Sequence, residues 1–269
     1  MPSLSGERVR FLVKPNASGS NGWLALRDDL AGAARDGTEM GRDLARRFAS
    51  LQVWFSDLDD FDTRSPAKII AMRAVGAGYL NPAYLGWILE TLFLFCSRGK
   101  KGGEAASWKN YYNRFLKAKA EGDWLNDEAF RFVDRLLASP SIEGLLYPGV
   151  IDFYARLGAE KYLVTRNLER IAFRYSKVIP YAAYYHEVED KAALVNSIVE
   201  SRPDVRRYGL GGDSIEDAQA ADALDFQYRK GRIDLPICLC RTASPRALDP
   251  SFNVFVGKDR SALASLLAT

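Results

Sequence analysis

Short apolar segments alternate with amphipathic ones through the second half of the chain. Apolar runs predict strands at 161–164, 208–210, 235–239 and 254–256, and helical spacing predicts helices at 151–157, 191–199 and 215–224. Strands that alternate with helices in this way are typical of a parallel sheet with helices on both faces. The expected fold class is therefore α/β, with a Rossmann-like sheet.

The first half of the chain has a different pattern. Residues 9–13 alternate as a strand does, and after a polar turn residues 23–48 have the composition of a helix. A continuous apolar run at 53–56 predicts a buried strand. Helical spacing without strand alternation then follows in several blocks. We expect three parts, namely an amino-terminal extension of unknown role at 1–50, an α/β core formed by 51–64 and 146–269, and an inserted all-helical cap at 65–145.

Composition narrows the classes of function. The chain has 269 residues, of which 48% are hydrophobic and 12% aromatic, and its formal net charge is +3. These values predict a globular protein and exclude a disordered one. The mild charge indicates no dedicated nucleic-acid surface, although a slightly basic pocket suits an anionic substrate. The oligomeric state stays open.

Cysteine and histidine are too few for the common metal and redox sites. Cys96, Cys238 and Cys240 form no disulfide framework, and the last two alternate within an apolar run, which favours buried thiols. The single histidine, His186, is interpreted as structural or incidental. The longest apolar stretch, 84–96, is too short to span a bilayer, and the amino terminus has no secretion signal. We expect a soluble, cytoplasmic protein with no membrane partner.

An Asp-x-Asp pair ends the apolar run at 53–56. Asp57 and Asp59 come directly after the predicted strand, where loops at the carboxyl end of a sheet carry binding and catalytic groups. Two carboxylates in one desolvated site repel each other unless a cation or a split between their pKa values relieves the repulsion. The alternative is a solvated Asp-rich turn, and the pair alone does not decide between them.

Two single residues add to this pair. Thr165 follows a predicted strand, where a hydroxyl and free backbone N–H groups suit a phosphate oxygen, although a helix N-cap explains it as well. Lys191 opens a predicted helix, where a cation is unfavourable to the helix dipole. Neutralising a phosphate is one reason for a lysine there, and a solvated side chain is the other.

A fourth segment, Gly212-Asp213-Ser214-Ile215-Glu216-Asp217, joins a strand to a helix. Asp213 and Asp217 are four residues apart, so they share one side of a helical first turn. A capping box around Ser214 explains the same residues. The preceding glycines suggest a dinucleotide site, but the third glycine of Gly-x-Gly-x-x-Gly is replaced by Ser214, which excludes it.

In their order along the chain, these four segments resemble the motifs of the haloacid dehalogenase-like (HAD) superfamily. Asp57-Leu58-Asp59 is similar to its first motif, Thr165 to its second and Lys191 to its third. The segment 212–217 is similar to the Gly-Asp-x-x-x-Asp form of the fourth. Leu146-Tyr147-Pro148-Gly149-Val150 also resembles the return from cap to core in members with a helical C1-type cap. The resemblance covers about residues 51–269.

The resemblance implies a Mg²⁺-dependent phosphomonoesterase that acts on a small phosphorylated metabolite. Asp57 would be the nucleophile that forms an aspartyl-phosphate, and Asp59 the general acid and base. Thr165 and Lys191 would bind the phosphoryl oxygens. The ligands expected for Mg²⁺ are Asp57, the backbone carbonyl of Asp59, and Asp213. Asp217 would not bind the metal itself but would orient Lys191 or a metal-bound water.

Other functions stay open on the same residues. A phosphotransferase or sugar-phosphate mutase would keep this core, whereas dehalogenase and phosphonate-cleaving relatives lack the second Asp. A non-catalytic interaction protein of HAD fold is the alternative from another class. Its only support is Phe61, which stands where the family usually has Thr or Val. In the cap, basic and aromatic residues suit either an anionic substrate or a solvated helix face; they are Lys100, Lys101, Lys109, Arg114, Tyr111 and Tyr112.

Overall fold

The structure is a computed structural model of the whole chain. It describes residues 9–13, 24–27, 30, 37–64, 142–167, 169–242 and 249–268. The chain divides into two compact units, one formed by 1–63 and 146–269 and the other by 64–145. Only the first is described almost throughout, and the account below concerns that unit. The predicted helical cap lies outside the described residues except for 142–145, and its basic and aromatic residues and Cys96 are among those that are not described.

In the described part of the chain, one eight-stranded sheet has the order β1-β2-β8-β7-β6-β3-β4-β5. Its strands are β1 (Val9–Val13), β2 (Leu24–Arg27), β3 (Val53–Ser56), β4 (Glu160–Val164), β5 (Ala183–Tyr185), β6 (Tyr208–Gly212), β7 (Ile237–Arg241) and β8 (Val254–Val256). The six strands from β8 to β5 are parallel, and β2 and β1 continue the sheet in antiparallel pairing. The predicted α/β fold with a Rossmann-like parallel sheet is confirmed.

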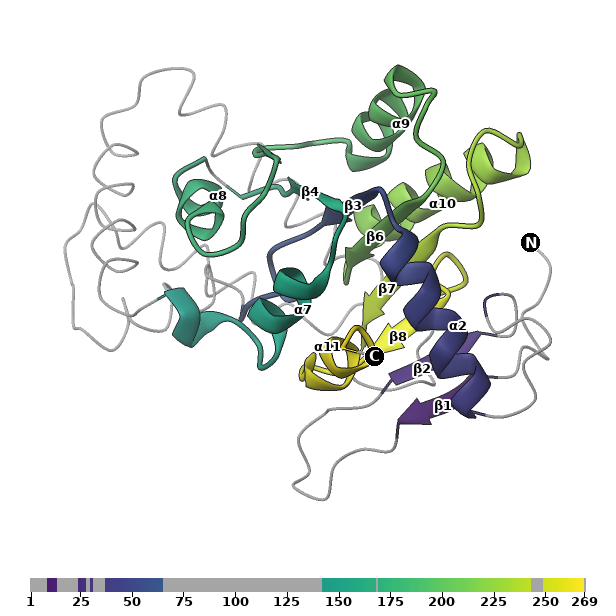
Figure 1. The fold of residues 1–269 in the computed structure, drawn as a ribbon. Helices are drawn as coiled ribbons and strands as arrows, with labels where there is room; N and C mark the ends of the chain where they lie inside the picture. Colours follow the sequence, from purple (N-terminus) through teal and green to yellow (C-terminus); the bar gives the residue numbers. More distant parts are fainter. Residues whose placement is uncertain are drawn as a thin grey trace, which may run out of the picture. The chain divides into compact units, whose positions relative to one another are not determined.

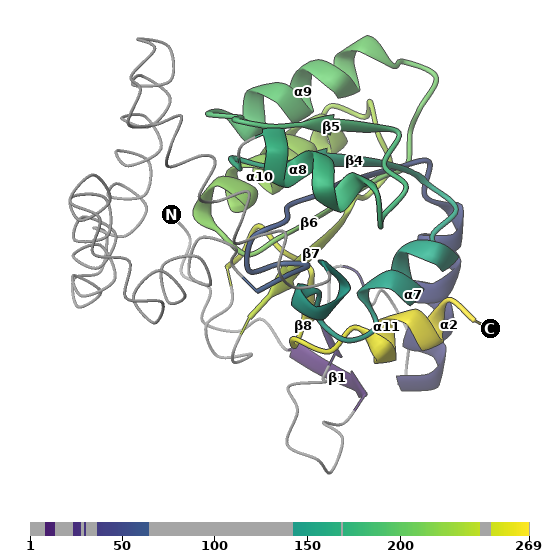
Figure 2. The same ribbon diagram turned by 90° about the vertical axis from the view of Figure 1, so that its left-hand side faces the viewer.

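Helices cover both faces of the sheet (Figures 1 and 2). The described helices are α2 (Gly37–Ser50), α7 (Val150–Arg156), α8 (Glu169–Ser176), α9 (Lys191–Ser201), α10 (Ile215–Arg229) and α11 (Ser261–Leu266), with a 3₁₀ turn at Ile142–Leu145. None of the described helices has the length and apolar character needed to cross a membrane.

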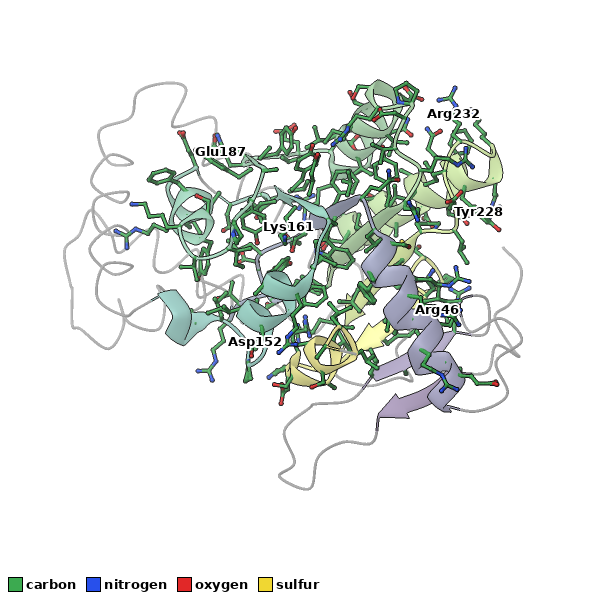
Figure 3. All side chains as sticks on the ribbon, in the orientation of Figure 1. Arg46, Asp152, Lys161, Glu187, Tyr228 and Arg232 are labelled. Atoms are coloured by element: carbon green, nitrogen blue, oxygen red, sulfur yellow. The ribbon has the colours of Figure 1, made fainter. Side chains whose placement is uncertain are left out.

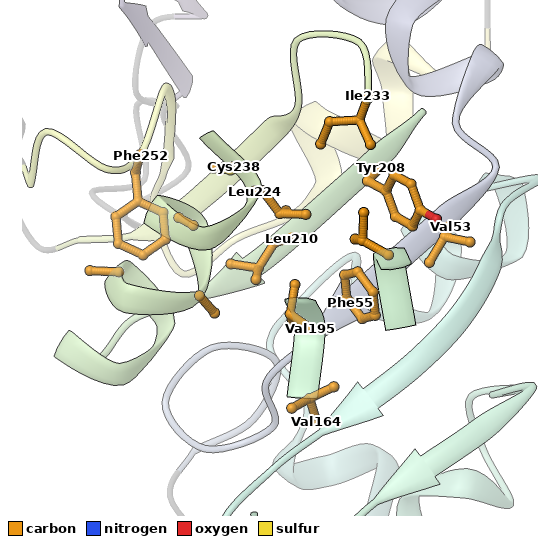
Figure 4. Close-up of a cluster of buried hydrophobic side chains, with 14 of the residues drawn as sticks. Val53, Phe55, Val164, Val195, Tyr208, Leu210, Leu224, Ile233, Cys238 and Phe252 are labelled. Atoms are coloured by element: carbon orange, nitrogen blue, oxygen red, sulfur yellow. The ribbon is translucent and has the colours of Figure 1, made fainter. Parts of the chain in front are cut away.

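The alternation of side chains along β3 builds a core on each face. Val53 and Phe55 pack toward α9 and α10, in the buried cluster drawn in Figure 4. Trp54 points the other way and contacts Phe48 of α2 and Phe153 of α7, with ring centroids 5.9 Å and 5.7 Å away. Because β3 is buried on both faces, its sequence is continuously apolar rather than alternating.

Charged and aromatic side chains mark the outer sides of these helices (Figure 3). Arg46 on α2 and Tyr228 on α10 are both exposed. On α9 and α10, the buried side chains include Val195, Ile198 and Leu224, which belong to the cluster packed against the sheet.

The amino-terminal extension differs in part from the expectation. The strand at 9–13 is confirmed as β1, but Leu24–Arg27 is strand β2 rather than the start of a helix, and the described helix begins at Gly37. Leu24, Ala25 and Leu26 are fully buried between neighbouring strands. Their helix propensity is overridden because pairing with β8 buries all three.

The remaining predicted strands and helices of the core are confirmed within a few residues. The segments α8, β5 and α11 are short, and sequence analysis did not find them.

Candidate active site

The residues singled out by the motifs lie at one edge of the sheet. Asp57 follows β3, Thr165 follows β4 and Asp213 follows β6, and these three strands are parallel neighbours. Their carboxyl ends therefore meet, and this edge is where α/β sheets bind ligands. The backbone N–H of Asp57 donates to the carbonyl of Gly211 at 2.8 Å, which holds the start of the Asp57 loop against β6.

Lys191 joins two of the carboxylates. Its Nζ lies 2.9 Å from Oδ1 of Asp57 and 2.6 Å from Oδ1 of Asp217, and all three side chains are almost fully buried. The helix N-cap is Asp190, whose carboxylate accepts from the N–H of Ala193 at 2.8 Å. Burial lowers the pKa of Lys191, but the attraction of Asp217 and Asp57 more than offsets this, so its pKa is raised and it stays charged.

Asp217 is held rigidly by the start of α10. Its Oδ2 accepts from the backbone N–H groups of Asp213 and Ser214 at 3.1 and 3.0 Å, and from the Ser214 hydroxyl at 2.6 Å. The capping box that the sequence allowed is present. Gly212 makes room for this carboxylate, because a Cβ there would lie 2.2 Å from Cγ of Asp217. Asp217 thus both caps α10 and contacts Lys191.

Three carboxylates converge beside Lys191. One oxygen each of Asp57, Asp213 and Asp217 lies within 4.8 Å of the others. Burial raises the pKa of Asp57 to about 8, against the opposing effect of Lys191. Burial and the nearby Asp57 and Asp217 raise the pKa of Asp213 as well. Hard oxygen donors that repel one another in a buried cluster fit a divalent cation such as Mg²⁺.

Asp59 and Thr165 lie at the same edge but outside this cluster. Asp59 is partly exposed, in the turn after β3, and its carboxylate is not among the three that converge. Thr165 is fully buried, and its hydroxyl accepts from the backbone and side-chain N–H groups of Asn167 at 3.2 and 3.0 Å. Asn167 therefore orients the hydroxyl that the motif places at the end of β4.

Phe61, the departure from the family pattern, has a packing explanation. Its ring is fully buried over Gly211, where a Cβ would lie 2.3 Å from Cζ of Phe61. Trp54 lies in the same way over Gly209. The glycines of β6 that suggested a dinucleotide site thus accommodate aromatic rings and, at Gly212, the Asp217 carboxylate.

Sequence analysis missed two arginines at this edge. Arg241 at the end of β7 lies 3.5 Å from Oδ2 of Asp213, and its Nε donates to the carbonyl of Asp60. Arg166, after Thr165, forms a largely buried ion pair of 2.7 Å with Glu216 in the first turn of α10. The only available signal was a charged residue at the end of a predicted strand, on the edge where the motifs gather.

Comparisons with known proteins find likeness at the level of fold. No family model and no curated protein matches the chain. A phosphoserine phosphatase in apo form has 9% identity and a TM-score of 0.48, over 80% of this chain and 98% of its own. A HAD family hydrolase from Salmonella enterica serovar Typhi has 10% identity and a TM-score of 0.47, over 80% of this chain and 71% of its own. A phospho-aspartyl intermediate analogue of phosphoserine phosphatase has 11% identity and a TM-score of 0.37, over 73% of this chain and 88% of its own.

Proposed function

We propose that this chain is a Mg²⁺-dependent phosphomonoesterase that hydrolyses a small phosphorylated metabolite through an aspartyl-phosphate on Asp57. The observation that carries the proposal is one buried cation, Lys191, in contact with both Asp57 and Asp217 beside Asp213. The lysine is buried, contacts two carboxylates and lies at the sheet edge where α/β proteins bind ligands. Its positive charge there suits the transfer of an anionic group such as a phosphoryl group.

Asp57 is the nucleophile in this proposal. Lys191 contacts Oδ1 of Asp57, so Oδ2 is the oxygen that attacks phosphorus in this proposal. The bond from phosphorus to the ester oxygen breaks as the bond to Oδ2 forms. Lys191 and Thr165 bind the phosphoryl oxygens, whose negative charge is the main electrostatic problem of phosphoryl transfer.

Asp59 transfers the proton. It donates a proton to the leaving ester oxygen in the first step, then takes one from the water that attacks the aspartyl-phosphate. Release of phosphate restores Asp57. Partial exposure of Asp59 suits this role, because its carboxyl group must reach both a leaving group and water.

The carboxylate cluster fits the metal. Asp57, Asp213 and the backbone carbonyl of Asp59 would hold Mg²⁺, which supplies positive charge against the phosphoryl oxygens. Both oxygens of Asp217 already accept hydrogen bonds, from Lys191 and from the start of α10. Asp217 therefore orients Lys191 rather than acting as a ligand.

The test is hydrolysis of p-nitrophenyl phosphate with and without Mg²⁺, in the parent protein and in Asp57→Asn. Turnover is expected only with Mg²⁺, and at least a 10³-fold loss is expected in Asp57→Asn because the nucleophile is removed. Asp59→Asn is expected to lose about 10²- to 10⁴-fold, the usual contribution of a general acid. Asp152→Asn, on the exposed side of α7, is the matched control and keeps full activity.

Metal-independent turnover, or equal turnover in Asp57→Asn, would contradict the proposal. If the parent is phosphorylated at Asp57 but transfers the group to a sugar hydroxyl faster than to water, the protein is a phosphotransferase instead.

A further inference from the structure

We propose that Asp62, which none of the motifs includes, is a positioning residue for this reaction, holding the Asp57 backbone and the turn that carries Asp59 through Ser56 and Tyr154. The inference rests on the proposed function and deepens it. It assigns a role to the most deeply buried carboxylate near the site, whose exposed fraction is 0%.

Asp62 binds two hydroxyl groups from different elements. Its Oδ2 accepts from the Ser56 hydroxyl of β3 at 2.7 Å and from the Tyr154 hydroxyl of α7 at 2.6 Å. The two hydroxyls also lie within hydrogen-bonding distance of each other. Hydrogen bonds to an ionised carboxylate are shorter and stronger than neutral ones, so this group fixes three elements at one point.

Ser56 carries the constraint to the nucleophile. It is the last residue of β3, directly before Asp57, and its hydroxyl also lies 3.0 Å from the Asp57 carbonyl. A shift of the Asp62 carboxylate therefore acts on the backbone of Asp57 through a single residue.

The turn after β3 carries the constraint to Asp59. The backbone N–H groups of Asp62 and Thr63 both donate to the carbonyl of Leu58, at 3.1 and 3.2 Å, and so close a loop that contains Asp59. Within this loop Asp60 has a left-handed backbone, with φ of 52°. A non-glycine residue is held in this conformation only where its surroundings fix it.

The outer side of the turn is tied down as well. Nη2 of Arg260 donates to the carbonyl of Phe61 at 2.7 Å, and the N–H of Tyr147 donates to the carbonyl of Asp62 at 2.9 Å. The turn is thus held on both sides, by the bond from Ser56 to the Asp62 side chain and by the bonds from Arg260 and Tyr147 to its backbone carbonyls.

A purely structural role does not need a charge at this position. Burial raises the pKa of Asp62 to about 6, against the hydrogen bonds from Tyr154 and Ser56 and the charge of Arg260. Its second oxygen, Oδ1, has no hydrogen-bond partner among the described residues. An apolar side chain of similar volume commonly stabilises such a site at least as well, so a carboxylate retained there favours a role in geometry.

The experiment compares kcat and KM for p-nitrophenyl phosphate in the parent, Asp62→Asn, Ser56→Ala and the double variant, with Mg²⁺. Each single variant is expected to lower kcat about 10- to 100-fold and to change KM less than twofold, because misplacing a reacting group slows the chemical step. The double variant is expected to lose little more than the worse single variant, since both changes break one link. Ser56→Ala removes a single oxygen and keeps the inference testable if Asp62→Asn fails to fold.

Asn253→Ala is the control for stability. Asn253 is also buried, and its side chain bonds the N–H of Cys238 and the carbonyl of Pro236 at the amino ends of β7 and β8, both at 2.8 Å. It is expected to lower Tm as a loss of buried hydrogen bonds does, with kcat unchanged.

The outcomes separate the two proposals. An active parent whose kcat survives both Asp62→Asn and Ser56→Ala would overturn the inference and leave the proposed function standing. Losses of kcat that add fully in the double variant would also overturn it. The same holds if Asn253→Ala loses as much kcat as the Asp62 and Ser56 variants do when their Tm values are equal. A parent without Mg²⁺-dependent turnover would refute the proposed function, and the inference with it.

Discussion

Arg241 is a positively charged residue at the sheet edge that none of the sequence motifs includes. It faces the carboxylate of Asp213 with only 14% of its side chain exposed, and it adds a second fixed positive charge to that of Lys191. A metal ion bound by Asp213 would therefore compete with Arg241 for its negative charge. At a few ångströms, the interaction between Arg241 and Asp213 is worth up to about 4 kcal/mol in a partly screened site.

Arg241→Gln is expected to tighten Mg²⁺ binding about 3- to 10-fold, because it removes the competing charge and keeps a donor for the carbonyl of Asp60. Isothermal titration calorimetry with Mg²⁺ alone measures this directly. Arg229→Gln removes the same charge from an exposed pair on α10 and is expected to change nothing. Weaker binding in Arg241→Gln would instead mean that the arginine mainly orients Asp213.

Asp62 gives the protein a defined response to pH. Because its folded pKa of about 6 is above the ordinary value of 3.8, the folded protein binds this proton more tightly than the unfolded chain does. Its burial is therefore costly above pH 6, and the cost disappears as the pH falls below about 4. Between pH 7 and pH 4, the free energy of unfolding of the parent is expected to rise relative to Asp62→Asn by up to about 3 kcal/mol. Urea titrations at the two pH values measure it, and a difference that stays flat would contradict the assignment.

Motif residues were easier to predict than their partners. Asp57, Lys191 and Asp213 stand at ends of strands or helices where their chemistry is unusual, and the structure brings them together with Asp217. Arg241 has only its position at the end of a strand as a signal, and Asp62 has none, because the roles proposed for both depend on contacts between segments far apart in the sequence.

Among the elements, β6 is the strand whose glycines are explained by the side chains packed against them. Gly209 and Gly211 lie beneath Trp54 of β3 and Phe61 of the turn after β3, so each large ring packs where β6 has no side chain. Of these two glycines, Gly211 is the tighter, since a Cβ there would lie 2.3 Å from Cζ of Phe61.

Gly211→Ala is expected to destabilise the protein by about 1–3 kcal/mol, the usual cost of overpacking a core, and to lower kcat because the displaced Phe61 moves the turn after β3. Gly158→Ala is the matched control, since a Cβ there has no neighbour within 4 Å. Chemical denaturation measures both variants. Adding Phe61→Leu to Gly211→Ala should recover part of the loss, and a fully additive double variant would refute the packing explanation.

Elements with a strong local pattern were predicted, and those defined by pairing were not. The strands at β3, β4, β6 and β7 are apolar runs bounded by polar residues. In contrast, β2 is four residues of good helix formers that become a strand because β8 offers an edge. A strand as short as β5 and a helix as short as α11 have too few residues for a clear period.

At the scale of the whole molecule, the amino-terminal extension covers the β8 side of the parallel sheet. The pairing of β2 with β8 buries Leu24, Ala25 and Leu26 and removes an exposed apolar edge, which is a common starting point for aggregation. Residues 1–50, to which the sequence assigned no role, thus add the strands β1 and β2 to the sheet.

A chain that lacks residues 1–27 is expected to express mainly as aggregate, or to lose several degrees of Tm, because β8 then presents an unpaired edge. Sedimentation velocity and thermal unfolding of the purified variant measure the two results. A monomeric truncated protein with unchanged Tm would mean that the extension adds nothing to the stability of the sheet.

The contact between Arg260 and the carbonyl of Phe61 also sets the order in which the site can form. The two residues are 199 positions apart, so this contact cannot exist until nearly the whole core has left the ribosome. Contacts between residues so far apart in sequence slow folding, because closing the long loop costs conformational entropy before the contact can form and stabilise the fold. The turn that carries Asp59 is therefore expected to gain this anchor late in folding, and in a nascent chain only after synthesis has passed residue 260.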